Sequence, residues 1–252
     1  MVTLQELTQY TNTFLQVDRF RDYCPNGLQV EGVDHVHSII TGVTASQALL
    51  DVANDQQADA ILVHHGYFWK NEDLRIVGIK RKRLATLLRN NISLLAYHLP
   101  LDAHAEIGNN AQLARLLGLQ IDGVLQSAAQ TVCGTYGHLK QAVPAEKFKR
   151  LIDSILQRNC THVNAGPANI ENIGWCTGAG QGFIELAVEQ KLDAYISGEI
   201  SEPTAHVARE AGIHYYAAGH HATERYGIQA LGEHLAQKYD LSHQFVDIDN
   251  PA

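Results

Sequence analysis

The sequence predicts an α/β fold with largely parallel or mixed sheets, and two observations lead to this class. In the first half of the chain, apolar runs of strand length alternate with helix-like segments, which is the signature of βαβ units. A helix that leads to Asp-Ala and then to a strand occurs twice, at 47–60 and at 181–194. An internal duplication of one α/β half explains this repeat, and chance similarity between two helix–strand units is the alternative.

The elements of the first half follow from apolar spacing and from glycine stops. Leu84, Leu87 and Leu88 recur at helical spacing, and Gly118 marks the end of a later helix. The predicted elements, in chain order, are an amphipathic helix beginning at 1–7, a strand at 36–43, a helix at 46–56, a strand at 59–64, a helix at 82–90, a strand at 92–98 and a helix at 109–117.

The second half of the chain has a different pattern of glycine and proline residues. Glycine and proline between about residues 124 and 173 predict a smaller middle region with a helix near 146–157, and the tail predicts a helix at 226–238 and a strand at 244–248. We expect three regions: residues 1–125, a first α/β region that carries His64, His65 and Asp102; residues 126–195, a variable middle region with the start of a second α/β half; and residues 196–252, which return His220 and Glu224 to the same site.

Composition excludes several classes of protein. The 252 residues can bury a core as one large domain or two smaller ones, and their net charge of −8, with no dominant basic stretch, does not indicate nucleic-acid or anionic-membrane binding. The N-terminus lacks the features of a signal peptide and no stretch is long enough to span a bilayer, so we expect a cytoplasmic protein without a membrane partner. The four cysteines, Cys24, Cys133, Cys160 and Cys176, form no Cys-x-x-Cys pair, which argues against a disulfide framework and a thiolate zinc site.

A histidine pair, His64 and His65, stands where an apolar run at 60–63 stops before Gly66. Ligands bind at the carboxyl ends of strands in α/β proteins, and two neighbouring imidazoles at such an end can reach two neighbouring ions. Taken alone, such a pair is more often two hydrogen-bonded histidines than two metal ligands. Further ligand groups elsewhere in the chain are needed to favour the metal interpretation.

Two further groups supply such partners. His98 and Asp102 follow the apolar run at 92–97, while His220 and Glu224 are four residues apart, which on a helix places them on one face. An ordinary exposed helical pair is the alternative for His220 and Glu224, and only the convergence of the groups argues against it. Imidazole with carboxylate suits zinc, iron or manganese, whereas calcium and magnesium prefer oxygen alone. The ligand set therefore predicts a transition-metal site.

Each of three other motifs can be interpreted either as part of a functional site or as an ordinary structural feature. In the register of the repeat Glu199 aligns with His65, so it is either a contributor to the pocket or a turn residue. The basic run at 80–83 is either a phosphate-binding segment or, more commonly, a solvated helix start. The glycine-rich turn at 178–182 precedes a predicted helix, but it lacks the lysine of a P-loop and the full spacing of a dinucleotide fingerprint.

A series of short motifs covers the chain nearly end to end. They are Pro25-Asn26-Gly27-Leu28-Gln29-Val30, Gly42-Val43-Thr44, His64-His65-Gly66, His98-Leu99-Pro100-Leu101-Asp102, Ser197-Gly198-Glu199 and Gly219-His220-His221-Ala222-Thr223-Glu224. With these motifs the chain resembles the Nif-three-like family, whose members are often labelled GTP cyclohydrolase I type 2 homologues, and is very similar to its bacterial YbgI-like branch. The resemblance is weakest at 126–171.

The resemblance implies two interlinked α/β regions, two divalent metal ions per subunit and a ring-shaped homohexamer whose sites face the interior. It carries metal binding to His64, His65, Asp102, His220 and Glu224. A carboxylate must bridge two ions that lie about 3.5 to 4 Å apart, and Asp102 or Glu224 could serve. His98 and His221 are interpreted as groups that orient the ligands. The family's Gly-Gly-x-Asn after the aspartate is only partly matched at 108–110, so we assign no role to that turn.

Two classes of function fit these residues. One is a metal-dependent hydrolase acting on a nucleotide-like substrate, in which two ions lower the pKa of a bound water and Glu224 or a nearby histidine moves the proton. The family label suggests ring opening of a guanine nucleotide, and a di-metal phosphoesterase would need much the same residues. The other class is a non-catalytic protein that stores, delivers or senses metal, or an assembly platform. An open coordination position distinguishes the two classes.

Overall fold

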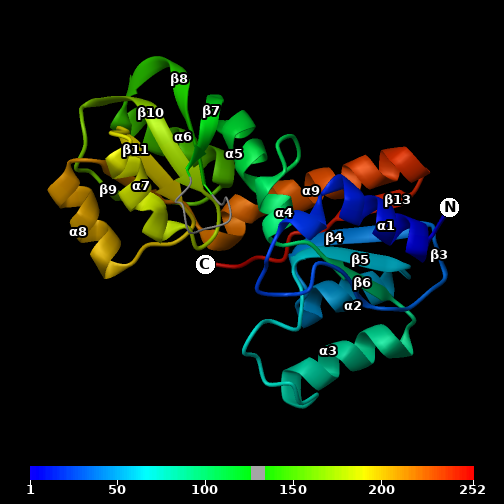
Figure 1. Cartoon of the computed structure of the whole chain (residues 1–252). Helices are drawn as coiled ribbons and strands as arrows, with labels where there is room; N and C mark the ends of the chain where they lie inside the picture. The colour runs from blue at the N-terminus through cyan, green and yellow to red at the C-terminus, as the bar shows by residue number, and fades with distance from the viewer. Residues whose placement is uncertain (126–133) are drawn as a thin grey trace. The chain divides into compact units, whose positions relative to one another are not determined.

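A computed structural model describes residues 1–125 and 134–252, which form two compact units (Figure 1). Unit 1 comprises Met1–Leu101 and Gly227–Asp249, and unit 2 comprises Asp102–Tyr226 and Asn250–Ala252. The chain passes from unit 1 to unit 2 within helix α4 (Leu99–Ala103) and returns within helix α9 (His220–Tyr239). The two units are therefore interlinked by the course of the chain, as the resemblance implied.

Unit 1 is built on a five-stranded sheet. Its elements are β1 (Val2–Thr3), α1 (Leu4–Phe14), the 3₁₀ turn η1 (Val17–Arg19), β2 (Gly27–Val30), β3 (His35–Val36), β4 (Ser38–Thr44), α2 (Gln47–Asp55), β5 (Ala60–His65), α3 (Gly78–Arg89), β6 (Ser93–Ala96) and β13 (Ser242–Phe245). The strand order is β13-β4-β5-β6-β2, in which only β2 runs antiparallel to its neighbour, and β1 pairs separately with β3.

The core of unit 1 forms where helices α2 and α3 cover one face of this sheet. Ser46 begins α2 by accepting a hydrogen bond from the backbone N–H of Leu49, and Leu49 is fully buried against the sheet together with Leu50. Burial of each such leucine contributes about 1.5 to 3 kcal/mol. Because a parallel strand is covered on both faces, β5 is apolar and buried along Ala60 to Val63. The predicted buried strand is thus confirmed.

Unit 2 is built on a six-stranded mixed sheet with the order β7-β8-β10-β11-β12-β9. Strands β10, β11 and β12 are parallel, and β7, β8 and β9 pair antiparallel with their neighbours. The elements are α5 (Asn109–Leu117), β7 (Leu119–Leu125), β8 (Gly134–Pro144), α6 (Ala145–Leu156), β9 (Thr161–Val163), β10 (Asn169–Cys176), the 3₁₀ turn η2 (Gln181–Phe183), α7 (Ile184–Glu189), β11 (Ala194–Ser197), α8 (Glu202–Ala211) and β12 (His214–Ala217).

The two units share one topological pattern, which supports the predicted repeat. Unit 1 follows the path β4-α2-β5-α3-β6 and unit 2 the path β10-α7-β11-α8-β12, each with three adjacent parallel strands. The last paired residues of the second and third strands are Val63 with Ala96 in unit 1, and Ser197 with Ala217 in unit 2. Residues that follow these pairs leave the sheet at its carboxyl edge, where α/β sheets carry ligands. The predicted α/β class with parallel and mixed sheets is confirmed.

Several boundaries differ from those predicted. Helix α3 begins at Gly78 rather than at 82, and α9 begins at His220 rather than at 226. The units also differ from the predicted ranges 1–125, 126–195 and 196–252. Residues 102–125 belong to unit 2 because strand β7 pairs with β8, and residues 227–249 belong to unit 1 because β13 pairs with β4.

Two expectations from composition concern membranes and cysteines. Across residues 1–125 and 134–252, no helix combines the length and the apolar character needed to cross a membrane. Cys24, Cys160 and Cys176 are buried and are not in disulfides, whereas Cys133 lies outside the described residues.

Candidate metal centre

His64 lies at the carboxyl end of β5 and is completely buried. Its Nδ1 is 2.9 Å from the backbone oxygen of Tyr97. Because a carbonyl oxygen only accepts hydrogen bonds, Nδ1 carries the proton, and the basic lone pair of the imidazole is on Nε2. This tautomer is the one that a metal ligand binding through Nε2 requires.

His65 follows on the same strand, and a hydroxyl group rather than a carbonyl group lies beside its Nδ1. Its Nδ1 lies 3.3 Å from Oγ1 of Thr44, the residue paired with it on β4, and its ring centroid is 4.5 Å from that of His64. The strand ends at His65, and at the next residue, Gly66, a Cβ would come within 2.3 Å of Oε1 of Gln29. Glycine at this position therefore leaves room for the Gln29 side chain directly after the histidine pair.

His98 lies just beyond the carboxyl end of β6, beside the same pair. Its ring centroid is 5.0 Å from that of His64 and 5.8 Å from that of His65. Ligand nitrogens of the three imidazoles all lie within 4.8 Å of one another, so this part of unit 1 could hold a metal ion. Nδ1 of His98 is 2.7 Å from Oδ1 of Asp22.

Asp102 provides a carboxylate at the beginning of unit 2, and three side chains hold it. Its Oδ1 accepts a hydrogen bond from Nδ2 of Asn109 at 2.8 Å and one from Oγ1 of Thr177 at 3.4 Å. Asn110 donates to the backbone oxygen of Asp102 at 3.2 Å and accepts from the backbone N–H of Thr177 at 3.1 Å. The turn at 108–110, to which the sequence assigned no role, therefore positions the aspartate.

His220 and Glu224 lie on the first turn of α9, as their spacing predicts. Nε2 of His220 is 3.2 Å from Oε2 of Glu224, and its Nδ1 is 2.8 Å from Oε1 of Glu199. Burial by itself would lower the pKa of His220, but the hydrogen bonds and charges of Glu224 and Glu199 raise it to about 9. Without metal, His220 is therefore an imidazolium held between two carboxylates.

Glu224 is almost completely buried, and a glycine provides the space for its carboxylate. Gly178 adopts φ +64°, and a Cβ there would come within 2.1 Å of Oε1 of Glu224. A carboxylate oxygen of Asp102 also lies within 4.8 Å of one of Glu224. Unit 2 thus places two carboxylates and an imidazole at one edge of its sheet, a donor set that suits a transition metal.

Replacing Gly178 by alanine is expected to displace the Glu224 carboxylate and to weaken metal binding at least about tenfold. The left-handed backbone conformation adds a cost of about 1 to 2 kcal/mol to the stability of the folded protein. Metal content and thermal unfolding measure the two effects. Gly182→Ala is the matched control in the same turn, because a Cβ at Gly182 meets no atom within 4 Å; equal metal loss in both variants would contradict the explanation.

Glu199, one of the motif residues with two interpretations, belongs with this group through its contact with His220. The repeat had indicated it by alignment with His65. In the basic run at 80–83, Lys80 forms an ion pair within unit 1: its Nζ is 3.2 Å from Oε2 of Glu72. His221 is buried, and its backbone N–H donates to the backbone oxygen of Ala252.

Some residues of this centre were missed by sequence reasoning. Asn109, Thr177 and Asp22 carry no recognisable metal-ligand spacing, because they act by hydrogen bonding to ligand candidates from distant parts of the chain. Asn109 alone had a sequence signal, the partly matched turn at 108–110.

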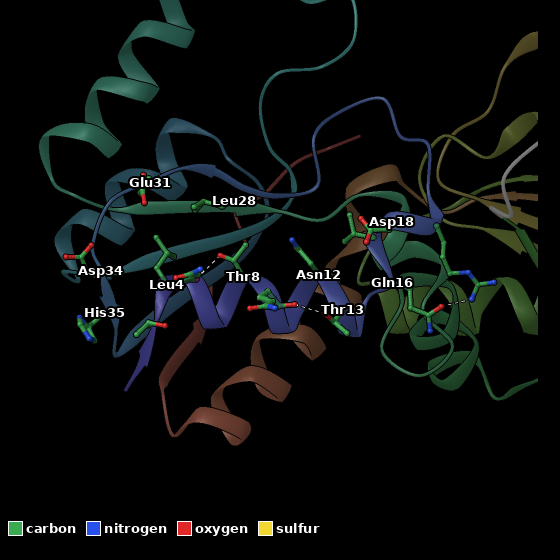
Figure 2. A pocket seen from close by; sticks show the side chains of 15 residues that line it. Leu4, Thr8, Asn12, Thr13, Gln16, Asp18, Leu28, Glu31, Asp34 and His35 are labelled. Atoms are coloured by element: carbon green, nitrogen blue, oxygen red, sulfur yellow. Dashed lines mark hydrogen bonds between the residues drawn. The ribbon is translucent and has the colours of Figure 1, made fainter.

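A groove of about 1230 Å³ lies along helix α1 in unit 1 (Figure 2). Gln16, Thr8 and Asn12 of or just after α1 face it, together with Leu28 of β2 and Glu31. Among the described residues that line it, none is a predicted metal ligand. Its amide and hydroxyl lining lacks the clustered imidazoles that a transition-metal site needs.

Comparison with known proteins gives matches over the whole chain. The family model described as Duf34/NIF3 (NGG1p interacting factor 3) matches residues 2–251. A Vibrio cholerae protein named GTP cyclohydrolase 1 type 2 homolog is 53% identical over 248 residues, which are 98% of each chain. A solved structure titled protein ybgI, of unknown function, has a TM-score of 0.96 and 51% identity, with 100% of both chains covered. A solved structure from Thermus thermophilus has a TM-score of 0.89 and 30% identity, again with 100% of both chains covered.

Proposed function

Because this chain belongs to the Duf34/NIF3 family, we propose that it is a metal-dependent hydrolase acting on a nucleotide-like substrate. One observation carries the proposal: imidazoles and carboxylates lie at the carboxyl edges of the sheets with hydrogen-bond partners beside them, and His64 and Glu224 are buried while His65, Asp102 and His220 are half-buried. A structural core does not require such a concentration of titratable groups, whereas a metal centre does.

Two divalent transition-metal ions, zinc, iron or manganese, are the proposed cofactors. The residues proposed to hold them are His64, His65, Asp102, His220 and Glu224. When bound, such a pair of ions lowers the pKa of a water molecule towards neutrality and polarises the group that the water attacks. Asp102 and Glu224 are the two candidates for a bridging carboxylate.

Glu224 is proposed to move the proton. Its burial in unit 2 limits competition from bulk water. Glu199 keeps Nδ1 of His220 occupied at 2.8 Å. The orientation of the imidazole is therefore fixed while Glu224 exchanges protons.

The proposed substrate class follows from the name of the relatives. A label of GTP cyclohydrolase 1 type 2 homolog points to ring opening of a guanine nucleotide, in which water attacks the imidazole carbon of the purine. A phosphoester of a nucleotide would use the same ligand set. The two reactions are distinguished by their products, because only ring opening destroys the purine ring and so changes its absorbance.

The proposal is tested by loading the purified protein with metal and following GTP and a generic phosphoester. We expect one of them to be consumed by the parent, and a Glu224→Gln variant that still holds metal to be slower by about 100-fold or more. Glu202→Gln is the control, because Glu202 is an exposed residue of α8. Metal binding without turnover of either substrate would support the non-catalytic storage, sensing or assembly function instead.

We also propose that the protein is a homohexamer. An exposed segment before and at the start of α3 supports this, because Leu74 is 91% exposed and Ile79 is 68% exposed in the single chain. Contact between copies would remove such apolar surface from water. Light scattering is expected to give about six times the chain mass, and a Leu74→Asp, Ile79→Asp variant is expected to dissociate; a monomeric parent would contradict the assembly.

A further inference from the structure

Glu199 is a partner of His220 whose side chain is not fixed by burial. Its Oε1 lies 2.8 Å from Nδ1 of His220, but 43% of the Glu199 side chain is exposed. An exposed carboxylate exchanges partners with water, and an ion pair of this kind contributes little by itself. The contact with His220 therefore depends on the groups that hold the backbone of Glu199 and its other carboxylate oxygen.

Tyr215 of β12 holds the backbone of Glu199. It is fully buried, and its hydroxyl donates a hydrogen bond to the backbone oxygen of Glu199. Burial raises the pKa of Tyr215, so the hydroxyl stays protonated and remains a donor. This bond joins the interior of unit 2 to the turn that follows β11.

Tyr195 of β11 supports the neighbouring glycine-rich turn in the same way. It is paired with Tyr215 in the parallel register of the two strands, and it too is fully buried. Its hydroxyl donates to the backbone oxygen of Gly180 at 2.8 Å. The next residue, Gln181, donates through Nε2 to Oε2 of Glu199 at 3.4 Å. The two tyrosines therefore act on one carboxylate through different atoms.

Backbone hydrogen bonds link the turn of Glu199 to the turns on either side of it. The N–H of Gly198 donates to the oxygen of Gly178 at 2.9 Å, and the N–H of Gly219 donates to the oxygen of Gly198 at 2.9 Å. Gly178 makes room for the Glu224 carboxylate, and Gly219 directly precedes His220. A displacement of the turn of Glu199 would therefore reach both of these candidate ligands.

We propose that Tyr195 and Tyr215 are positioning residues, which hold Glu199 against His220 from the interior of unit 2. A metal-binding histidine usually donates its second ring N–H to a carboxylate, and such outer partners orient the ring. The consequence for metal affinity rests on the proposed function, in which His220 is a ligand. The inference goes beyond that function by assigning a role to two buried residues outside the short motifs.

Tyr216 is the matched control, at the next position of β12. It is also fully buried, and its hydroxyl also donates to a backbone oxygen, that of Ala145, at 3.1 Å. Because neighbouring residues of a strand face opposite sides of the sheet, Tyr216 belongs to a different cluster of the core from Tyr215. Tyr216→Phe therefore removes one buried hydroxyl, as Tyr215→Phe does, without releasing Glu199.

The first measurement is made without metal, by chemical denaturation of the full chain in the presence of chelator. Glu199→Gln, His220→Gln and the double variant give the coupling between the two residues as a ratio of unfolding equilibrium constants. We expect Tyr215→Phe to reduce this ratio by at least about threefold and Tyr216→Phe to leave it unchanged. A general loss of stability cancels in the ratio, so a merely structural role would not change it.

The second measurement is the affinity for Zn²⁺, by competition with a chromophoric chelator. Tyr215→Phe is expected to weaken binding about tenfold, the lower end of the range for outer partners of a metal-bound histidine. In a Glu199→Gln chain the same change is expected to have no further effect, because the carboxylate through which Tyr215 acts is already absent. Tyr216→Phe is expected to leave the affinity unchanged.

A coupling that is unchanged in the folded Tyr215→Phe variant, or that falls equally in Tyr216→Phe, would overturn the inference. An equal loss of Zn²⁺ affinity with and without the Glu199 carboxylate would also overturn it. Circular dichroism establishes that each variant is folded, and Tyr195→Phe provides the same comparison if Tyr215→Phe does not fold. Failure of the proposed function is distinguishable, because it would appear as absent turnover or absent metal, whereas the coupling is measured without either.

Discussion

Replacing His64 and Glu224 together by alanine is expected to reduce bound metal from about two ions per chain to almost none. Each substitution removes a buried candidate metal ligand. The loss of both is expected to raise the dissociation constant for metal by the product of the two single effects. Elemental analysis of protein purified without chelator measures the change. Because metal binds the folded form, the parent is also expected to lose thermal stability when a chelator is added, whereas the variant is not.

A matched control exists on helix α8. His206 and Glu202 are also a histidine and a glutamate four residues apart, with Nε2 and Oε1 4.0 Å from each other, but both side chains are exposed. Alanine at both positions is expected to leave metal content unchanged. A parent without metal, or a His64→Ala, Glu224→Ala variant that keeps it, would remove the basis for the hydrolase proposal.

Metal affinity is expected to rise by about tenfold for each pH unit up to about pH 9, because the ion must replace the proton on Nε2 of His220. Glu224 and Glu199 outweigh the effect of burial and raise the pKa of His220 to about 9. Below that pH the imidazolium and the metal compete for the same nitrogen. Competition titration with a chromophoric chelator, corrected for the chelator's own protonation, measures the slope.

The same proton stabilises the metal-free protein. A pKa that is raised on folding contributes stability that is complete below the ordinary histidine value of 6.5 and is lost as the pH rises through about 9. The free energy of unfolding of the metal-free chain should therefore fall over this interval. Chemical denaturation in the presence of chelator at a series of pH values measures it.

Glu199→Gln separates this explanation from a general effect of pH. Removal of one carboxylate lowers the pKa of His220, so both the affinity slope and the stability change should shift to lower pH. Glu202→Gln, at an exposed position, should leave both unchanged. A profile that is flat between pH 6.5 and 9, or one that does not move in Glu199→Gln, would show that His220 is not the titrating group.

Apolar patterning correctly predicted elements whose extent is defined by local signals. The predicted helix at 109–117 coincides with α5, and the strand predicted at 59–64 is β5 with a shift of one residue. Both are fixed by local signals: the Gly118 stop in one and a continuous apolar run in the other. Helix α4, which contains Asp102, was missed because it has only five residues and includes Pro100.

The start of α9 and the boundaries of the units could not be obtained from local pattern. His220 to Thr223 are polar and small residues that begin a 20-residue helix after Gly219, which adopts φ +100°. The preceding turn, packed against Arg158, exists only in the folded chain. Likewise, β13 belongs to unit 1 because it pairs with β4 some 200 positions earlier, which no local window can reveal.

The sequence by itself determined the α/β class, and it predicted the repeat and the candidate ligand types, because hydrophobic periodicity and residue chemistry are local properties. The tertiary structure alone decided which atoms hold the ligands: the Tyr97 carbonyl at His64, Asp22 at His98 and Glu199 at His220. It also decided that Asn109 and Thr177 position Asp102. The physical reason is that hydrogen bonds act over about 3 Å between residues that folding brings together, and these selected the ring tautomer and the charge of each group.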